Sequence, residues 1–356
     1  MEAKAMGQNK RQYPKLRFKG FTDPWEQRKL NKLVKSFDKD RIPVESRDRK
    51  KGIYPYYGAT GIVDYVDNYI FNGEYVLLAE DGANITMRTN PVTYKTHGKF
   101  WVNNHAHVFQ TLTNTDSDFL VNILEKINYI KYNTGTAQPK LNAQTVSKIE
   151  ITTPGLNEQK KIGILLNRVE KLIASNQRKV DKLKELKKGY MQKLFPKDGS
   201  NVPELRFPGF TDPWEQCKFK DIVNVRSGRD YKGLAEGTIP VYGTGGYMLS
   251  VDKALSYSEN AIGIGRKGTI NNPYILIAPF WTVDTLFYAI PMEQRNLNFI
   301  YGIFQIINWK QKDESTGVPS LSKSIINSVK VTVPKSEEQY IIGELLKTID
   351  QLIASN

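Results

Sequence analysis

Two short motifs contain residue types that could bind a metal or a nucleotide. His105-Ala-His107 would place two imidazoles on one face of a strand. The chain has only three histidines and the region offers no cluster of further ligands, so we do not expect a metal site. Residues 263–268 (GIGRKG) fit the G-x-G-x-x-G pattern of a dinucleotide site, which needs a helix opening at the glycines. Strand and turn residues follow instead, which favours a loop presenting Arg266 and Lys267 to a phosphate.

Two further features could indicate methyl transfer or a nucleophile. Residues 272–274 (NPY) are similar to the Asn-Pro-Pro-Tyr of amino-methyltransferases, which positions an extruded adenine. One proline is missing and no glycine-rich cofactor loop lies upstream, so a turn is the better interpretation. Cys217 is the only cysteine, which excludes an intramolecular disulfide and suits a reducing compartment.

The elements that would position such residues occur twice. Residues 16–30 (LRFKGFTDPWEQRKL) and 205–219 (LRFPGFTDPWEQCKF) agree at twelve of fifteen positions, and we call them the opening motifs. Residues 172–176 (LIASN) likewise return at 352–356. Because Cys217 replaces Arg28 of the first copy, no catalytic thiol is duplicated. No Ser/His/Asp arrangement recurs either, so we expect a binding protein and not an enzyme.

Each opening motif is followed by a variable middle segment and a closing helix. The middles share little beyond Tyr-Gly-x-x-Gly at 57–61 and 242–246 and a Phe-Trp pair. Short β-rich runs alternate with glycine and asparagine, and helices are expected at 118–130 and 297–309. Each middle is therefore predicted to be a mixed α/β (α+β) domain of about 130 residues.

The first closing helix is predicted over residues 158–195, which would measure about 57 Å. Its apolar residues follow a heptad spacing, and the second copy begins the same stripe. We expect the two helices to pair as an antiparallel coiled coil. The alternative is that each helix packs on its own domain. The expected seam consists of Ile162, Leu166, Val169, Ile173, Asn176, Val180, Leu183, Ile342, Leu346, Ile349 and Ile353.

The formal net charge is +14, which favours a polyanionic partner because each neutralised phosphate releases counterions. Residues 158–195 alone carry a net +7. No apolar run approaches a membrane span, and the first residues lack the apolar core of a signal peptide. We therefore expect a cytoplasmic protein that binds nucleic acid.

Polar loops recur at corresponding places in the two middles. Glycine allows the backbone to approach a phosphate closely, and Asn, Gln, Arg and Lys supply contacts to base edges and phosphates. For any single residue an ordinary hairpin tip remains the alternative. The DNA contacts predicted in the first copy are Tyr57, Gly58, Thr60, Asp81, Asn84, Arg88, Asn103, Asn104, His105, Thr134, Thr136, Gln138 and Lys140. Those in the second copy are Arg229, Tyr242, Thr244, Arg266, Lys267, Asn271, Thr316, Ser320 and Lys323.

The order of motif, variable domain and helix, repeated once, resembles the specificity (S) subunit of type I restriction–modification systems. The resemblance covers essentially the whole chain. The matching residues are Trp25-Glu26 and Trp214-Glu215, the loops 134–141 (TGTAQPKL) and 316–321 (TGVPSL), and the helix openings Glu158-Gln159 and Glu338-Gln339.

The resemblance implies a division of labour. Each variable domain would be a target-recognition domain that reads one half of a bipartite site on double-stranded DNA. The helices would act as a spacer and as docking surfaces for two methyltransferase subunits that bring S-adenosylmethionine. Restriction subunits with ATP- and Mg-dependent translocase activity would join the complex. This chain itself would be non-catalytic and would bind no cofactor or metal.

The predicted domains follow from these boundaries. They are a first recognition domain (1–157), the central helix (158–195), a linker (196–204), a second recognition domain (205–337) and a shorter second helix (338–356). Either residues follow Asn356 in the protein, or the helices pair over only part of their length. Two alternatives remain: a DNA adenine methyltransferase with a built-in reader, and a duplicated adaptor for an acidic protein partner.

Overall fold

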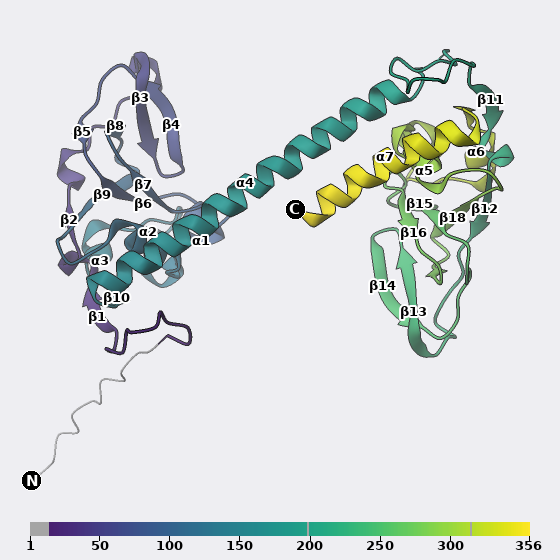
Figure 1. The fold of residues 1–356 in the computed structure, drawn as a ribbon. Coiled ribbons are helices and arrows are strands. Elements are labelled where there is room, and N and C mark those ends of the chain that lie inside the picture. The colour runs from purple at the N-terminus through teal and green to yellow at the C-terminus, as the bar shows by residue number, and fades with distance from the viewer. Residues whose placement is uncertain (1–13, 198, 314) are drawn as a thin grey trace, which may run out of the picture. The chain divides into compact units, whose positions relative to one another are not determined.

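The computed structural model describes residues 14–197, 199–313 and 315–356 (Figure 1). The chain folds into two compact units, with the boundary between Ala174 and Ser175. The boundary lies within one continuous helix, α4 (Leu156–Leu194). Each unit therefore contains one half of α4, one opening motif and one variable middle.

The first unit is built from two four-stranded sheets and a strand pair that closes its base. The sheets have the orders β2-β9-β6-β7 and β4-β3-β8-β5, and β1 pairs with β10. The strands are β1 (Glu26–Lys29), β2 (Val34–Ser36), β3 (Lys51–Gly58), β4 (Gly61–Val66), β5 (Phe71–Asn72), β6 (Tyr75–Ala79), β7 (Thr93–Thr96), β8 (Lys99–Val102), β9 (Ala106–Thr111) and β10 (Glu150–Thr153). The helices besides α4 are η1 (Leu30–Lys32), η2 (Asp38–Asp40), η3 (Ser46–Asp48), α1 (Asn84–Met87), α2 (Ser117–Glu125), η4 (Tyr129–Tyr132) and α3 (Ala143–Ser147).

The second unit repeats this plan. Its sheets have the orders β12-β18-β15-β16 and β14-β13-β17, and β11 pairs with β19. The strands are β11 (Glu215–Lys218), β12 (Val223–Ser227), β13 (Glu236–Gly243), β14 (Gly246–Val251), β15 (Ala261–Gly265), β16 (Tyr274–Leu276), β17 (Trp281–Thr282), β18 (Leu286–Pro291) and β19 (Lys330–Val333). The helices are η5 (Phe219–Asp221), α5 (Leu297–Ile306), η6 (Trp309–Lys312), α6 (Lys323–Ser328) and α7 (Ser336–Ser355). The predicted duplicated mixed α/β fold is therefore confirmed.

The opening motifs are structural clamps. Arg17 donates two 2.7 Å hydrogen bonds to Glu158, whose side chain is 2% exposed, and Arg206 holds Glu338 in the same bidentate way at 2.8 Å. A bidentate arginine–carboxylate pair fixes geometry as well as charge. The repeated motif thus ties the segment before each variable middle to the first turn of the helix that follows that middle.

The tryptophan of each motif packs on the helix that follows β9 or β18, namely α2 in the first unit and α5 in the second. Trp25 meets Phe119 edge-on at a ring distance of 6.1 Å, and Trp214 meets Phe299 at 5.6 Å. Each motif also contains a strand, β1 or β11, that pairs antiparallel with the strand before the closing helix, β10 or β19. The duplicated sequence is therefore accounted for by closure of the fold.

Several predicted helix bounds differ from the structure. The helix expected at 118–130 ends at Glu125 as α2, because the Asn128 side chain accepts from the Ile130 N–H and starts the separate turn η4. The helix expected at 297–309 likewise ends at Ile306, before η6. The helices α4 and α7 each begin two residues earlier than predicted.

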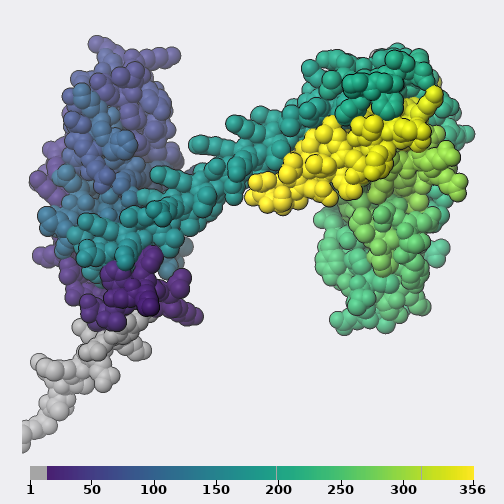
Figure 2. All heavy atoms as spheres, viewed as in Figure 1, coloured from purple at the N-terminus to yellow at the C-terminus, as the bar shows by residue number. Residues whose placement is uncertain are grey.

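The two closing helices meet within the second unit. Ile342 and Leu346 of α7 are buried in a core that also contains residues of α5 and of the last turns of α4, and Ile349 is buried as well. Lys187 of α4 donates hydrogen bonds of 2.7 and 2.8 Å to Asp350 of α7. The space-filling view shows α7 lying against the end of α4, and the helices run antiparallel there (Figures 1 and 2). Pairing thus involves the last turns of α4.

The seam residues of the first half of α4 have a different environment. Val169 is 42% exposed and Ile173 is 64% exposed, whereas Ile349, the counterpart of Val169 in α7, is buried. The other seam residues are partly exposed, namely Ile162, Leu166, Asn176, Val180, Leu183 and Ile353.

Among the described residues, no helix is both long and apolar enough to cross a membrane.

Candidate nucleic-acid interface

Four separate segments of the first unit are joined into one surface. They are 57–60 at the tip of the β3–β4 hairpin, 80–82 after β6, 103–105 before β9, and 134–141 before α3; we call them the first loop surface. The backbone hydrogen bonds that join them run from Asn103 N to Tyr57 O (3.0 Å), Glu80 N to His105 O (2.9 Å), Leu141 N to Glu80 O (2.7 Å) and Gly82 N to Pro139 O (3.0 Å). The predicted contacts therefore come together although the sequence separates them widely.

The second unit builds the same frame from different residues. Its segments 242–245, 266–268, 283–285 and 316–321 form the second loop surface. The corresponding hydrogen bonds run from Val283 N to Tyr242 O (3.0 Å), Arg266 N to Thr285 O (2.8 Å), Leu321 N to Arg266 O (2.9 Å) and Gly268 N to Pro319 O (2.8 Å). Two loop surfaces with one backbone plan carry dissimilar side chains.

The longest loop of each surface is shaped by one side chain at its base. The Asn133 Oδ1 accepts from the Gly135 and Lys140 N–H groups at 2.9 and 2.8 Å. Asp313 accepts at 3.0 Å from Ser315 and Ser320 in the same way. The hydrogen bonds from Ser320 and Ser315 lower the pKa of Asp313 below its usual value. Both loops are therefore preformed, which reduces the ordering cost of binding.

The charge carried by the frame is opposite in the two units. Asp81 forms an isolated antiparallel β-bridge with Lys140, and Lys267 forms the matching β-bridge with Ser320. Glu80 and Asp81 of the first unit therefore occupy the same backbone positions as Arg266 and Lys267 of the second. Arg266 and Lys267 are both exposed. Carboxylates accept from base amino groups, whereas Arg and Lys donate to guanine or to phosphate. The two surfaces are therefore suited to different sequences.

Beneath the first loop surface lies a charged cluster that the sequence did not predict. His107 is fully buried, with Nδ1 at 2.7 Å from Asp38 Oδ2 and Nε2 at 2.8 Å from the Leu141 carbonyl. Arg41 binds Glu80 Oε2 at 2.6 Å. Burial raises the pKa of Asp38, but the hydrogen bonds from His107 and the Val108 N–H, with the charges of His107 and Arg41, together hold that pKa below its usual value. The His-x-His motif was the only sequence signal of this cluster.

His105 and His107 do not act as a ligand pair. His105 is exposed and lies 2.8 Å from Asp81 through Nδ1, whereas His107 points into the core. In the described part of the chain, no group of three or more His, Cys, Asp or Glu side chains gathers in a way that could hold a metal ion.

Three of the predicted DNA contacts have partners within the unit. Arg88 forms a 2.6 Å ion pair with Glu125, which also accepts from the Val92 and Thr93 N–H groups. Asn84 bonds within the turn that follows α1, through both its amide nitrogen and its oxygen. Asn103 is 7% exposed and its Oδ1 accepts from the His105 N–H. These side chains help to shape the loops through those contacts.

The remaining predicted contacts of the first copy are better placed. Thr60, Asn104, Thr134, Thr136, Gln138 and Lys140 are exposed on the first loop surface. Tyr57 and Gly58 are buried beneath the hairpin tip. The surface therefore presents hydroxyl, amide and ammonium groups over an aromatic base.

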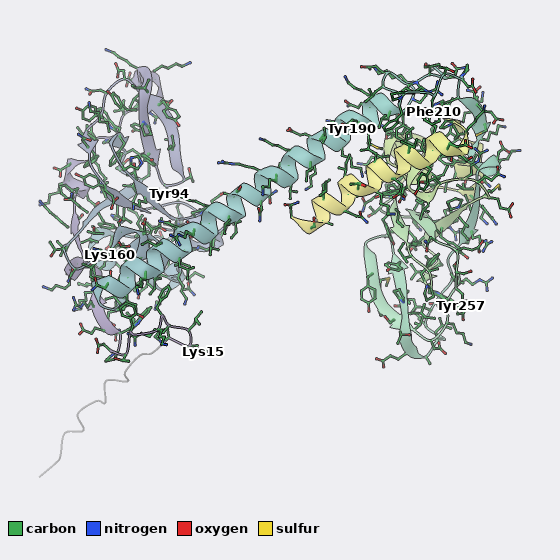
Figure 3. The ribbon with its side chains drawn as sticks, viewed as in Figure 1. Lys15, Tyr94, Lys160, Tyr190, Phe210 and Tyr257 are labelled. Carbon is green, nitrogen blue, oxygen red and sulfur yellow. The ribbon has the colours of Figure 1, made fainter. Side chains whose placement is uncertain are left out.

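The second copy also divides into exposed and packed residues. Arg229, Asn271, Thr316 and Lys323 are exposed, and Thr244 and Ser320 are partly exposed. Tyr242 packs against Tyr247 and Tyr274, at ring distances of 6.4 and 6.1 Å. Tyr257 of the same unit is 65% exposed (Figure 3). Tyr247 is 63% exposed.

The remaining motifs have structural explanations. Residues 261–265 form the strand β15 and no helix opens at the glycines, which agrees with the rejection of a dinucleotide site. Tyr274 donates a 2.6 Å hydrogen bond to the Gly243 carbonyl. Burial raises the pKa of the Cys217 thiol, which lies on β11, so little reactive thiolate forms at neutral pH.

Comparisons with known proteins identify the family. The family model of the type I restriction modification DNA specificity domain matches residues 22–185 and again 211–356. A putative type I restriction enzyme specificity subunit of Haemophilus influenzae is 27% identical over 93% of this chain and 89% of its own length. The MjaVIII specificity subunit of Methanocaldococcus jannaschii is 24% identical over 93% and 87%.

A solved structure shares the fold. The crystal structure of a type I restriction-modification system S subunit from M. genitalium covers 97% of this chain and 94% of its own, with a TM-score of 0.74 at 18% identity. The two matched segments coincide with the two structural repeats, each with its own loop surface. The chain therefore belongs to the family of type I restriction modification DNA specificity proteins and contains the family's domain twice.

Proposed function

We propose that this chain reads a bipartite DNA sequence, with each loop surface recognising one half. The observation that carries the proposal is the pair of loop surfaces built on four matched backbone hydrogen bonds but opposite in local charge. A shared frame supplies the same approach to the groove, and the side chains on it select the bases. Two different surfaces therefore select two different half-sites.

The complex that uses this reading would contain further subunits. Two methyltransferase subunits would bring S-adenosylmethionine, and restriction subunits would bring ATP- and Mg-dependent translocation. The specificity chain would contribute recognition and no chemistry.

A selection experiment tests the proposal directly. The full chain, reconstituted with its methyltransferase subunits, would be incubated with duplexes containing a random segment of about 20 base pairs, roughly two turns of duplex, and the bound fraction sequenced. We expect two short conserved elements separated by unread positions. Enrichment of one contiguous element, or of none at all, would contradict the proposal.

The continuous helix α4 supports a role as the spacer. Its 39 residues correspond to roughly 58 Å of helix. A heptad inserted near residue 176, where the side chains are mostly exposed, preserves the periodicity of both halves. We expect such a variant to recognise the same half-sites with a longer gap. An altered half-site with the original gap would argue against a spacer.

A further inference from the structure

Both the N–H and the carbonyl of Leu141 are hydrogen-bonded, and only the bond from the N–H is repeated in the frame of the second unit. Its N–H donates to the Glu80 carbonyl at 2.7 Å, as Leu321 N–H donates to Arg266. Its carbonyl accepts from His107 Nε2 at 2.8 Å. Leu141 ends the 134–141 loop, and its side chain is fully buried. The position of the loop therefore depends on β6 and, through His107, on β9.

The geometry assigns both ring protons to His107. Its Nδ1 and Nε2 each lie within 2.8 Å of an oxygen that only accepts, namely the Asp38 carboxylate and the Leu141 carbonyl. A neutral imidazole has one N–H and would leave a lone pair facing one of these oxygens. An imidazolium satisfies both, and the adjacent carboxylate balances its charge.

The surrounding charges come from several elements. Asp38 and Arg41 lie at and just after η2, Glu80 follows β6, and Lys140 lies on the loop itself. Glu80 Oε2 is 3.8 Å from His107 Nδ1 and 2.6 Å from Arg41, and Glu80 Oε1 is 3.4 Å from Lys140. The His107 ring also stacks on Phe109 at a centroid distance of 5.8 Å. The imidazolium is thus one member of a network that extends to the exposed loop.

The second unit has no equivalent of this arrangement at the matching positions. His107 pairs with Leu78 in the β6–β9 register, and Phe287 pairs with Ile264 at the same place between β15 and β18. Phe287 in turn pairs with Ser227 on β12. A buried ion pair in the first unit is thus replaced by an apolar ring, over which Arg266 lies at 5.8 Å.

We propose that His107 is a positioning residue for DNA reading, which as a buried imidazolium between Asp38 and Leu141 sets the 134–141 loop and so the first half-site. The inference rests on the proposed function of the loop surfaces. His107 itself touches no DNA; it acts through the loop. The second half-site does not depend on such a residue.

Variants patterned on the second unit separate positioning from stability. His107→Phe retains the packing of the ring but leaves the buried Asp38 carboxylate without its partner, so both stability and loop position are expected to suffer. The double variant His107→Phe/Asp38→Ser introduces the residue types that the second unit has at these places, those of Phe287 and Ser227, and so removes the buried carboxylate. We expect it to regain much of the lost stability, while the Leu141 carbonyl remains unheld. His97→Gln, at an exposed histidine of the same unit, is the control.

The measurement is the sequence preference at each half-site, obtained by selection with the reconstituted complex. For the double variant we expect discrimination at the first half-site to fall by about tenfold or more, with the second half-site and the gap unchanged. Restoration of both stability and first-half preference would overturn the inference, because His107 would then be only a stability element. Loss of preference in both halves would also overturn it. If the unmodified chain selects no sequence, the proposed function itself fails.

A spectroscopic measurement tests the inference without any variant that might misfold. The chain has three histidines, so their ring nitrogen resonances can be assigned by single substitution. At neutral pH we expect both His107 nitrogens to show the shift of an N–H. One bare ring nitrogen would contradict the assigned geometry.

Discussion

The two loop surfaces differ in the charged side chains on and beneath them, whereas their backbones follow the same plan. Four matched hydrogen bonds give both surfaces one frame. In the first unit acidic groups and a buried imidazolium lie under that frame, whereas in the second unit arginine and lysine project from it. Duplication has therefore kept the scaffold and allowed the chemistry to diverge. Recognition can change in one unit without altering how the other is built.

The glycines of the two long loops provide the largest expected contrast. A Cβ on Gly135 would lie 1.9 Å from the Gln138 carbonyl oxygen, whereas a Cβ on Gly317 would meet nothing within 4 Å. We expect Gly135→Ala to displace its loop and reduce discrimination at the first half-site on the order of 100-fold, as for the loss of one or two base contacts. Gly317→Ala is the matched control. Equal effects of the two variants, measured by binding to half-site mutants, would show that the loops do not differ in this way.

The arginine clamps are the same in both units, so their removal should affect the two units equally. Arg17→Met and Arg206→Met each leave a carboxylate that is 2% exposed without its partner. We expect each to lower the free energy of unfolding of its own unit by about 2 kcal/mol, somewhat less than for a fully buried pair because each arginine keeps some solvent contact. Denaturant unfolding monitored separately in each unit measures this. A large effect in one unit only would mean that the clamps are not equivalent.

A smaller effect is expected at the cations of the second loop surface. Lys267 is exposed and lies in the frame beside Ser320. If it contacts a phosphate, Lys267→Gln should weaken binding several-fold for all sequences and reduce the salt slope by about one. Lys218→Gln, on the exposed β11 strand of the opening motif, is the control and should leave the slope unchanged. A change in base preference without a change in slope would assign Lys267 to base reading instead.

The smallest effect is expected on the stability of the first unit at acid pH. The pKa of Asp38 is lowered in the folded state, so its contribution to stability is present above the unfolded value of 3.8 and is lost as the pH falls below it. We expect the first unit to lose stability more steeply than the second between about pH 4 and pH 2. Asp38→Asn should flatten that difference. Identical acid profiles for the two units, followed by residue-resolved NMR, would count against the buried pair.

The sequence predicted the duplication, the domain type and the long helix, because these depend on local and periodic patterns. Twelve shared positions in the opening motifs and a heptad stripe need no tertiary information. The ends of α2 and α5 were misplaced because a capping asparagine and a short turn interrupt an apolar pattern that continues beyond them.

The candidate site was harder to predict, since its partners are distant in sequence. His107 lies 69 residues from Asp38, and Arg88 lies 37 residues from Glu125. No spacing rule relates such positions, so the sequence indicates neither the buried pair of His107 with Asp38 nor the ion pair of Arg88 with Glu125. The loops themselves were found because glycine and polar residues mark them in both copies.

The central claim is that the two units read DNA independently. Residues 31–150 would be exchanged for the corresponding segment of another family member, leaving the opening motif, α4 and the second unit in place. Methylation mapping of the reconstituted complex should then show a new first half-site, with the second half-site and the gap unchanged. A change in both half-sites, or in the second alone, would contradict the account.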